Sequence, residues 1–189
     1  MYQKYHTEAL VLGSRERGES DRVIALYTRN FGLIYARASA IRAEKSRMRY
    51  ALQHYARANV SLVKGKRGWR IAGVTPVASL RAAQREVGVF ARIAQLLLRF
   101  AAREDRNLYL FEVLSEAHAS LLKRSGVHGT VELICVARVL YALGYLSAEA
   151  LGTALFTHSA YREEHLAETE SLRDLLLSHV NRAIAESQL

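Results

Sequence analysis

The chain has 189 residues, half of them hydrophobic, which is enough for a sizeable core and argues against wholesale disorder. No apolar run reaches the roughly eighteen residues of a membrane span, and the start lacks the apolar stretch of a signal peptide. A cytoplasmic protein is therefore expected. The single cysteine, Cys135, excludes an intrachain disulfide and a multi-cysteine zinc site. Its apolar helical surroundings predict a small buried side chain.

The formal net charge of +9 is concentrated in the N-terminal part of the chain. Residues 1–80 carry 15 Lys and Arg against 5 Asp and Glu, whereas residues 81–189 carry 12 against 13. A segment this basic attracts polyanions, and nucleic acid is the commonest polyanion in a cell. The asymmetry predicts that one end of the protein binds nucleic acid while the nearly neutral remainder has another task.

Five short segments rich in β-branched and aromatic residues precede Pro76, the only proline. The expected strands cover residues 7–13, 22–28, 33–39, 58–63 and 69–75. They indicate a small closed or nearly closed barrel, because an open sheet of this size would leave exposed edges. Residues 46–57 have helical spacing between the third and fourth strands, which is the layout of an OB-fold.

After residue 80 the apolar residues recur with the period of an amphipathic helix. The expected helices cover residues 81–103, 107–123, 131–143 and about 171–186. Gly126 and Gly144 are candidate C-terminal caps, and Thr130 is a candidate N-terminal cap. The sequence therefore predicts an α+β protein. A five-stranded OB-fold barrel over residues 1–78 would bind nucleic acid, and an α-helical bundle over residues 79–189 would follow it.

The predicted barrel carries a cluster of basic and aromatic residues. Alternation along the third strand places Ile34, Ala36 and Ala38 on one face and leaves Tyr35 and Arg37 on the other. If the small residues point inward, the outer face is the one that OB-folds use for oligonucleotides, where cations follow the backbone and aromatic rings stack on bases. The candidate binding residues are Tyr35, Arg37, Arg42, Lys45, Arg47, Arg49, Tyr50, Lys64, Lys66 and Arg67. The cluster also contains Arg57 and Arg70, whereas Trp69 alternates with Ile71 and is expected in the core.

Catalytic residues are poorly indicated. Glu16, Glu19 and Asp21 share one turn and could hold a metal ion, but the interleaved arginines favour a self-neutralised turn. The seven histidines lack ligand spacing, and no glycine-rich phosphate loop occurs. A non-enzymatic protein without a cofactor is expected. Two alternatives remain: an RNA-binding OB-fold protein whose bundle forms a dimer and, more remotely, a metal-dependent nuclease built on the three carboxylates.

Two stretches of the basic part, TEALVLGSRERGESDRVIALYTRNFGLI and IRAEKSRMRYALQHY, resemble the bacterial recombination mediator family RecO. The first is similar to the family's opening strand and its GE-S-D-type turn, and the second to its basic segment ending in Leu-Gln. Residues 110–117 and 132–145 are similar to the family's central helices. Ala40, Glu44 and His54 stand where the family usually has a glycine and two prolines. The four-cysteine zinc module of many relatives is missing, so the resemblance is to a short form.

The resemblance implies a protein that binds single- and double-stranded DNA and anneals complementary strands. It implies action with RecR, helping RecA to replace single-strand-binding protein at gaps, in the cytoplasm and with the nucleoid. The helical part would then be the place where partners dock, including the acidic tail of single-strand-binding protein. Such a tail needs an apolar pocket beside a cation, for which Arg124 and Arg138 are the candidates.

Overall fold

The computed structural model describes residues 3–43, 46, 48–80, 84–123 and 126–187. The chain divides into two compact units, which are treated separately below. The first unit is Met1–Val87 with Ala101–Leu108, and the second is Gly88–Phe100 with Tyr109–Leu189. The sequence predicts one boundary near residue 78, whereas in the structure the chain returns to the first unit at residues 101–108.

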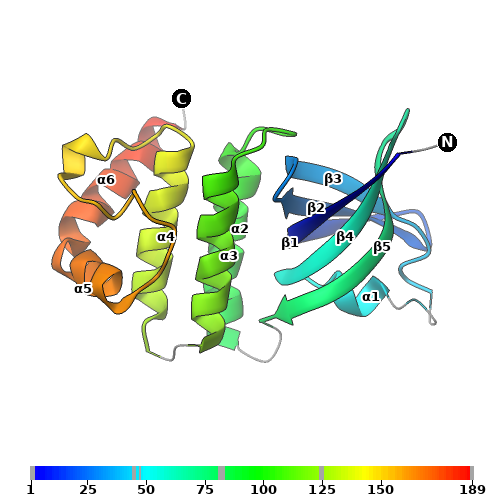
Figure 1. Ribbon diagram of the computed structural model, residues 1–189, viewed down its shortest axis with the longest axis horizontal. Coiled ribbons are helices and arrows are strands. Elements are labelled where there is room, and N and C mark those ends of the chain that lie inside the picture. Colours follow the sequence, from blue (N-terminus) through cyan, green and yellow to red (C-terminus); the bar gives the residue numbers. More distant parts are fainter. Residues whose placement is uncertain (1–2, 44–45, 47, 81–83, 124–125, 188–189) are drawn as a thin grey trace. The chain divides into compact units, whose positions relative to one another are not determined.

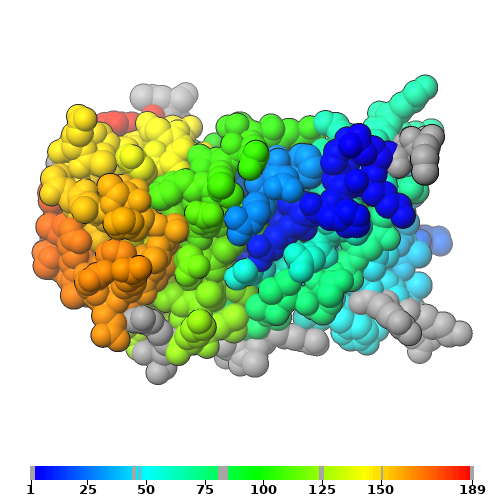
Figure 2. Space-filling model, in the orientation of Figure 1, coloured from blue at the N-terminus to red at the C-terminus, as the bar shows by residue number. Residues whose placement is uncertain are grey.

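The first unit is a five-stranded barrel, drawn in blue to green in Figure 1. Its elements are β1 (Lys4–Arg17), β2 (Asp21–Thr28), β3 (Gly32–Ala38), α1 (Met48–Ala51), β4 (Ala56–Gly65) and β5 (Gly68–Ser79). The strands close in the order β1-β2-β3-β5-β4, with β3 and β5 parallel and the other pairs antiparallel. The face drawn in Figure 2 shows β1 beside the cyan and green strands, where β1 pairs with β4. The predicted OB-fold barrel is confirmed.

Alternating side chains of the strands fill the barrel. Ile34, Ala36 and Ala38 of β3 are all buried in this core, as their spacing predicts. Trp69 also belongs to the core and is 6% exposed. Its ring lies 4.8 Å from the ring of Phe31, and Tyr5 packs edge-on against both. The inward set leaves Tyr35 and Arg37 on the outer face of β3.

The helix between β3 and β4 is shorter than its spacing predicts. It ends at Ala51, and Tyr55 adopts a positive φ of 62° instead of continuing the helix. The backbone N–H of Tyr55 donates to the carbonyl of Val11 on β1 at 2.8 Å, which turns the chain directly into β4. Pairing with the barrel therefore outweighs the helical pattern of this stretch.

Residues 101–106 add a short piece of backbone to the edge of β3 that does not pair with β2. Arg103 pairs with Leu33 in a parallel bridge, and the N–H of Glu104 donates to the carbonyl of Leu33 at 2.9 Å. Gly32 makes this approach possible, because a Cβ built on it would lie 1.8 Å from the carbonyl oxygen of Asp105. We call residues 101–106 the docked segment.

The second unit is helical. Its elements are most of α2 (Gln84–Phe100), α3 (Leu108–Lys123), α4 (His128–Ala142), the short η1 (Glu149–Leu151), α5 (Glu163–Ser171) and α6 (Arg173–Glu186). All four expected helices are present with shifted ends, as α2, α3, α4 and α6, whereas α5 is not predicted from the sequence. None of the helices in the described part of the chain is long and apolar enough to cross a membrane.

The helix caps follow the sequence only in part. Gly144 ends α4 as predicted: its φ is 81°, its N–H donates to Tyr141, and the next N–H donates to Leu140. Thr130 is not the N-cap, because α4 begins at His128 and the hydroxyl of Thr130 donates to the Glu170 carboxylate. The cap expected at Gly126 depends on residues 124–125, which lie outside the described residues.

Cys135 lies on α4 and is fully buried. Burial raises the pKa of its thiol to about 12, so the thiolate form is disfavoured. The prediction of a small buried side chain is confirmed.

Candidate nucleic-acid interface

A groove of about 510 Å³ runs across the outer surface of the barrel. Among the described residues, its lining contains six cations and no carboxylate; the cations are Arg15, Arg17, Arg37, Lys66, Arg67 and Arg70. Tyr35 and Trp69 supply aromatic surface, and the glycines on either side of the β4–β5 turn complete one end. A concave surface with this charge is suited to a polyanion rather than to a neutral ligand.

The strand register places three of the arginines in one row. Arg15 on β1 lies opposite Val23 on β2, and Val23 lies opposite Arg37 on β3. Arg37 in turn lies opposite Arg70 on β5. Neighbouring strands are about 4.8 Å apart, and like charges directly opposite one another destabilise a sheet. Bound anions such as phosphates would relieve this repulsion.

Asp21 holds the middle arginine of the row. The Nε of Arg37 donates to Oδ2 of Asp21 at 2.7 Å, and the backbone N–H of Ala40 donates to Oδ1 at 2.8 Å. The hydrogen bond from Ala40, and then those from Arg37, lower the pKa of Asp21 below its usual value. The carboxylate therefore stays ionised and keeps Arg37 in a defined orientation at the groove.

The other five cations of the groove are exposed and form no ion pair with the described residues. Within the described residues, Arg15, Arg17, Lys66, Arg67 and Arg70 have no carboxylate within ion-pair distance. Lys66 and Arg67 sit in the tight turn between β4 and β5, where Gly68 takes a positive φ of 94°. These charges are available to an incoming anion without breaking an internal ion pair.

The structure gathers Tyr35, Arg37, Lys66 and Arg67 of the predicted binding residues in the groove and places others elsewhere. Arg42 pairs with Glu16 at 3.3 Å, and Lys64 pairs with Glu104 while lying 5.0 Å above the Trp69 ring. Neither lines the groove.

Two further predicted residues, Arg49 and Tyr50, lie on α1 and contact each other. Arg49 donates to the Tyr50 hydroxyl at 3.0 Å and covers its ring at 5.0 Å. They do not line the groove. Arg57 of the wider basic cluster pairs with Glu8. Lys45 and Arg47 lie outside the described residues.

Sequence reasoning missed Arg15 and Arg17, which the turn RERGESDR seemed to neutralise. In the structure β1 continues to Arg17, so the alternation of the strand separates these arginines from Glu16. Glu16 instead faces Arg22 at 3.8 Å and Arg42 at 3.3 Å. The alternation Arg15-Glu16-Arg17 indicates that the two arginines share one face of a strand. This inference requires knowing that β1 extends to Arg17.

The carboxylates proposed for the nuclease alternative do not converge. Asp21 accepts hydrogen bonds from Arg37 and from the backbone of Ala40, and Glu16 forms ion pairs with two arginines. Among the described residues, no three His, Cys, Asp or Glu side chains are grouped so that they could hold a metal ion. The geometry gives Glu16 and Asp21 ion-pair partners rather than a shared metal position.

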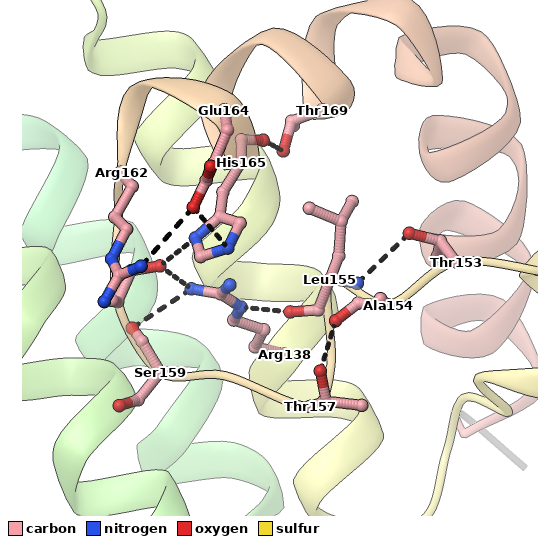
Figure 3. A network of polar contacts seen from close by, with 11 residues as sticks. Arg138, Thr153, Ala154, Leu155, Thr157, Ser159, Arg162, Glu164, His165 and Thr169 are labelled. Atoms are coloured by element: carbon pink, nitrogen blue, oxygen red, sulfur yellow. Dashed lines mark hydrogen bonds and ion pairs between the residues drawn. The ribbon is translucent and has the colours of Figure 1, made fainter.

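Arg138 lies in the interior of the helical unit, contrary to the exposed cation that the sequence suggested (Figure 3). It is 0% exposed. Its Nε donates to the carbonyl of Leu155 at 2.8 Å, and one terminal nitrogen donates to the carbonyls of Ser159 and Ala160 at 3.1 and 2.9 Å. Arg138 therefore organises the loop before α5 and is not accessible to an acidic tail. The other candidate, Arg124, lies outside the described residues.

The barrel sequence matches a known protein family. The family profile described as "Recombination protein O N terminal" matches residues 1–80, which include all five strands. DNA repair protein RecO of Desulfitobacterium hafniense is 48% identical over 62 residues, covering 33% of this chain and 23% of the relative.

Longer matches extend into the helical unit. DNA repair protein RecO of Myxococcus xanthus is 30% identical over 149 residues, covering 65% of this chain and 61% of the relative. The protein of the same name from Syntrophobacter fumaroxidans is 30% identical over 145 residues, covering 75% of this chain and 58% of the relative. The chain thus spans less than two thirds of the length of these relatives. Residues 1–80 thus match the N-terminal domain of the RecO family, and the chain is similar to RecO proteins into its helical unit.

Proposed function

We propose that this chain is a DNA-binding recombination mediator that binds single- and double-stranded DNA and anneals complementary strands without being an enzyme. The observation that carries the proposal is the row of Arg15, Arg37 and Arg70 in a groove lined by cations and free of carboxylates. The name that the relatives share, DNA repair protein, supports DNA as the polyanion.

The groove would promote annealing by charge screening. Two DNA strands repel each other through their phosphates, and a surface that neutralises several phosphates at once lowers the repulsion enough for bases to meet. Contacts to phosphate carry no sequence information, so binding is expected to be similar for all sequences. Arg15, Arg17, Lys66, Arg67 and Arg70 would make these contacts, with Arg37 positioned by Asp21.

We further propose that the protein acts with partners at gaps in DNA. These partners are a RecR-like protein, single-strand-binding protein through its acidic tail and, indirectly, a RecA-like recombinase. Support comes from the similarity to the RecO family and from the charge division between the basic barrel part and the nearly neutral remainder. With Arg138 buried, the docking surface for an acidic tail would need a different cation.

Strand annealing tests the proposal. Complementary oligonucleotides, naked or coated with single-strand-binding protein, are mixed with the purified chain without nucleotide or metal. Annealing of both substrates, reduced by the double variant Arg15→Ala/Arg70→Ala, is the expected result. Annealing of naked strands alone would leave DNA binding in place and remove the mediator role. Stronger binding to RNA than to DNA of the same sequence would favour the RNA-binding alternative.

A further inference from the structure

Tyr35 does not present a free ring to the groove. The guanidinium of Arg103 lies over it, with Cζ 4.6 Å from the ring centroid. Tyr35 is half-buried, whereas Arg103 is exposed. The ring therefore has one face already covered by a planar cation, and this cation reaches the barrel from beyond the strands, on the docked segment.

The backbone, rather than the side chain of Arg103, sets this position. Arg103 is bridged to Leu33, and the N–H of Glu104 donates to the Leu33 carbonyl at 2.9 Å. The carboxylate of Glu104 pairs with Lys64 on β4, and this pairing lowers the pKa of Glu104. The backbone pairing at Leu33 and the ion pair with Lys64 thus hold the docked segment to the barrel, where Asp105 lies close to Gly32.

We propose that Arg103, held over the ring of Tyr35, is a specificity-determining residue whose outer guanidinium face stacks on one unpaired base. The proposal deepens the proposed function and rests on DNA binding in the groove. A guanidinium is planar and weakly hydrated, so it stacks on aromatic faces, nucleobases included. Tyr35 supports it from behind and lines the groove on which the phosphates would lie.

This arrangement distinguishes single strands from duplex. In a duplex the base faces are stacked on their neighbours, so only phosphates reach the cations of the groove. In a single strand a base can turn toward Arg103 while its phosphates remain on the arginine row. Arg103 on Tyr35 therefore adds affinity for single-stranded DNA, whereas duplex affinity comes from the phosphate contacts alone.

The substitution Arg103→Lys tests this directly, since it keeps the charge and removes the plane. Affinities of the full chain are measured for a single-stranded oligonucleotide, for the same oligonucleotide with abasic sites, and for the duplex. Stacking on one base is worth about 1–3 kcal/mol, or roughly five- to 150-fold in affinity. We expect Arg103→Lys to lose at least about fivefold on the normal single strand alone, with the salt dependence unchanged.

Matched variants separate the possible outcomes. Arg106→Lys, an exposed arginine of the same segment, should bind all three ligands like the parent chain. Tyr35→Leu removes the supporting ring and should reproduce the loss seen with Arg103→Lys. Unchanged single-strand affinity in Arg103→Lys, or an equal loss on all three ligands, would overturn the stacking role. Failure of the parent chain to bind any of the three would instead refute the proposed function.

Discussion

Arg37 on β3 and Arg70 on β5 lie opposite each other on parallel neighbouring strands, and among the described residues only Arg37 of the two has a carboxylate partner. Asp21 neutralises Arg37 in the unliganded protein, while Arg70 stays uncompensated within the described residues. Arg70 therefore carries the uncompensated charge of the pair, and an anion between the two guanidinium groups would be bound favourably. The relationship points to a surface arranged for ligand binding rather than for stability.

Replacing Arg70 by Ala should weaken DNA binding about equally for all sequences. Loss of one phosphate contact should reduce the slope of log K against log salt by about 0.7 for single strands. Folding stability should be unchanged or slightly higher, because a like-charge neighbour of Arg37 is removed. Fluorescence anisotropy between about 50 and 200 mM salt measures both quantities. Arg182→Ala, an exposed arginine on α6, is the charge-matched control. A slope equal to that of the parent chain would remove Arg70 from the interface.

Replacing Gly32 by Ala should detach the docked segment. The added Cβ would lie 1.8 Å from the carbonyl oxygen of Asp105, and the φ of 62° at Gly32 is itself unfavourable for alanine. The strained backbone alone costs about 1–3 kcal/mol, so the free energy of unfolding should fall by at least that much. Urea unfolding gives the loss, and faster amide exchange at Glu104 would report the detachment.

A control for this variant is Gly18→Ala. Gly18 also has a positive φ, 67°, but a Cβ there would meet no atom within 4 Å. It should show the backbone strain without the steric clash, so a smaller loss and normal exchange at Glu104 are expected. Equal losses of stability and equal exchange at Glu104 in the two variants would mean that Gly32 is required only for its positive φ.

Local patterns in the sequence predicted the barrel well. The alternation of Ile34, Ala36 and Ala38 oriented β3 correctly and placed Tyr35 and Arg37 outside. The charge of the turn between β4 and β5 likewise placed Lys66 and Arg67 in the groove. These inferences succeeded because strand periodicity and turn composition depend on residues close together in the chain.

The failures came from contacts between distant parts of the chain. The docked segment joins β3 through backbone atoms, which no side-chain pattern announces. The sequence suggests that Arg138 is a surface cation, since no acidic side chain near it in the chain offers it a partner. Its acceptors are backbone carbonyls of residues 155–160, which the side-chain pattern does not reveal. A local pattern shows neither an arginine's backbone partners nor the loop that buries it.

Replacing Arg138 by Met should strongly destabilise the helical unit and leave the barrel's DNA affinity unchanged. The carbonyls of Leu155 and Ser159 would lose the donor that Arg138 supplies, whereas that of Ala160 would still accept from His165. Each unsatisfied buried acceptor costs about 1–3 kcal/mol, so we expect a loss of at least about 2 kcal/mol in urea unfolding. Arg138→Lys should recover only part of it, because an ammonium cannot reproduce the planar fork.

The neighbouring Arg162 offers a control for Arg138. Its side chain is 73% exposed and pairs with Glu164 at 3.5 Å, so Arg162→Met should change stability by less than about 1 kcal/mol. A stable Arg138→Met variant that lost affinity for an acidic peptide would restore the surface role that the sequence suggested.

Glu170 at the end of α5 should make the helical unit sensitive to acid. Hydrogen bonds from Arg173 and then from Thr130 lower the pKa of this carboxyl to about 2. Because the folded-state pKa lies below its ordinary value, the ionised form stabilises the native state above about pH 4.5. This contribution is lost as the pH falls from about 4.5 toward 2. Glu170→Gln should therefore be less stable than the parent chain at pH 6, with a gap that narrows below about pH 4.

Urea unfolding of both proteins at about pH 6, 4 and 3 measures this gap. Glu186→Gln on α6 is the control, since Glu186 is exposed and the described residues give it no ion-pair partner. Its stability should follow that of the parent chain at every pH. A gap for Glu170→Gln that is as large at pH 3 as at pH 6 would mean that the contacts of Glu170 act through packing. A gap that closes on acidification would tie the stabilisation to the charge that Arg173 and Thr130 hold in place.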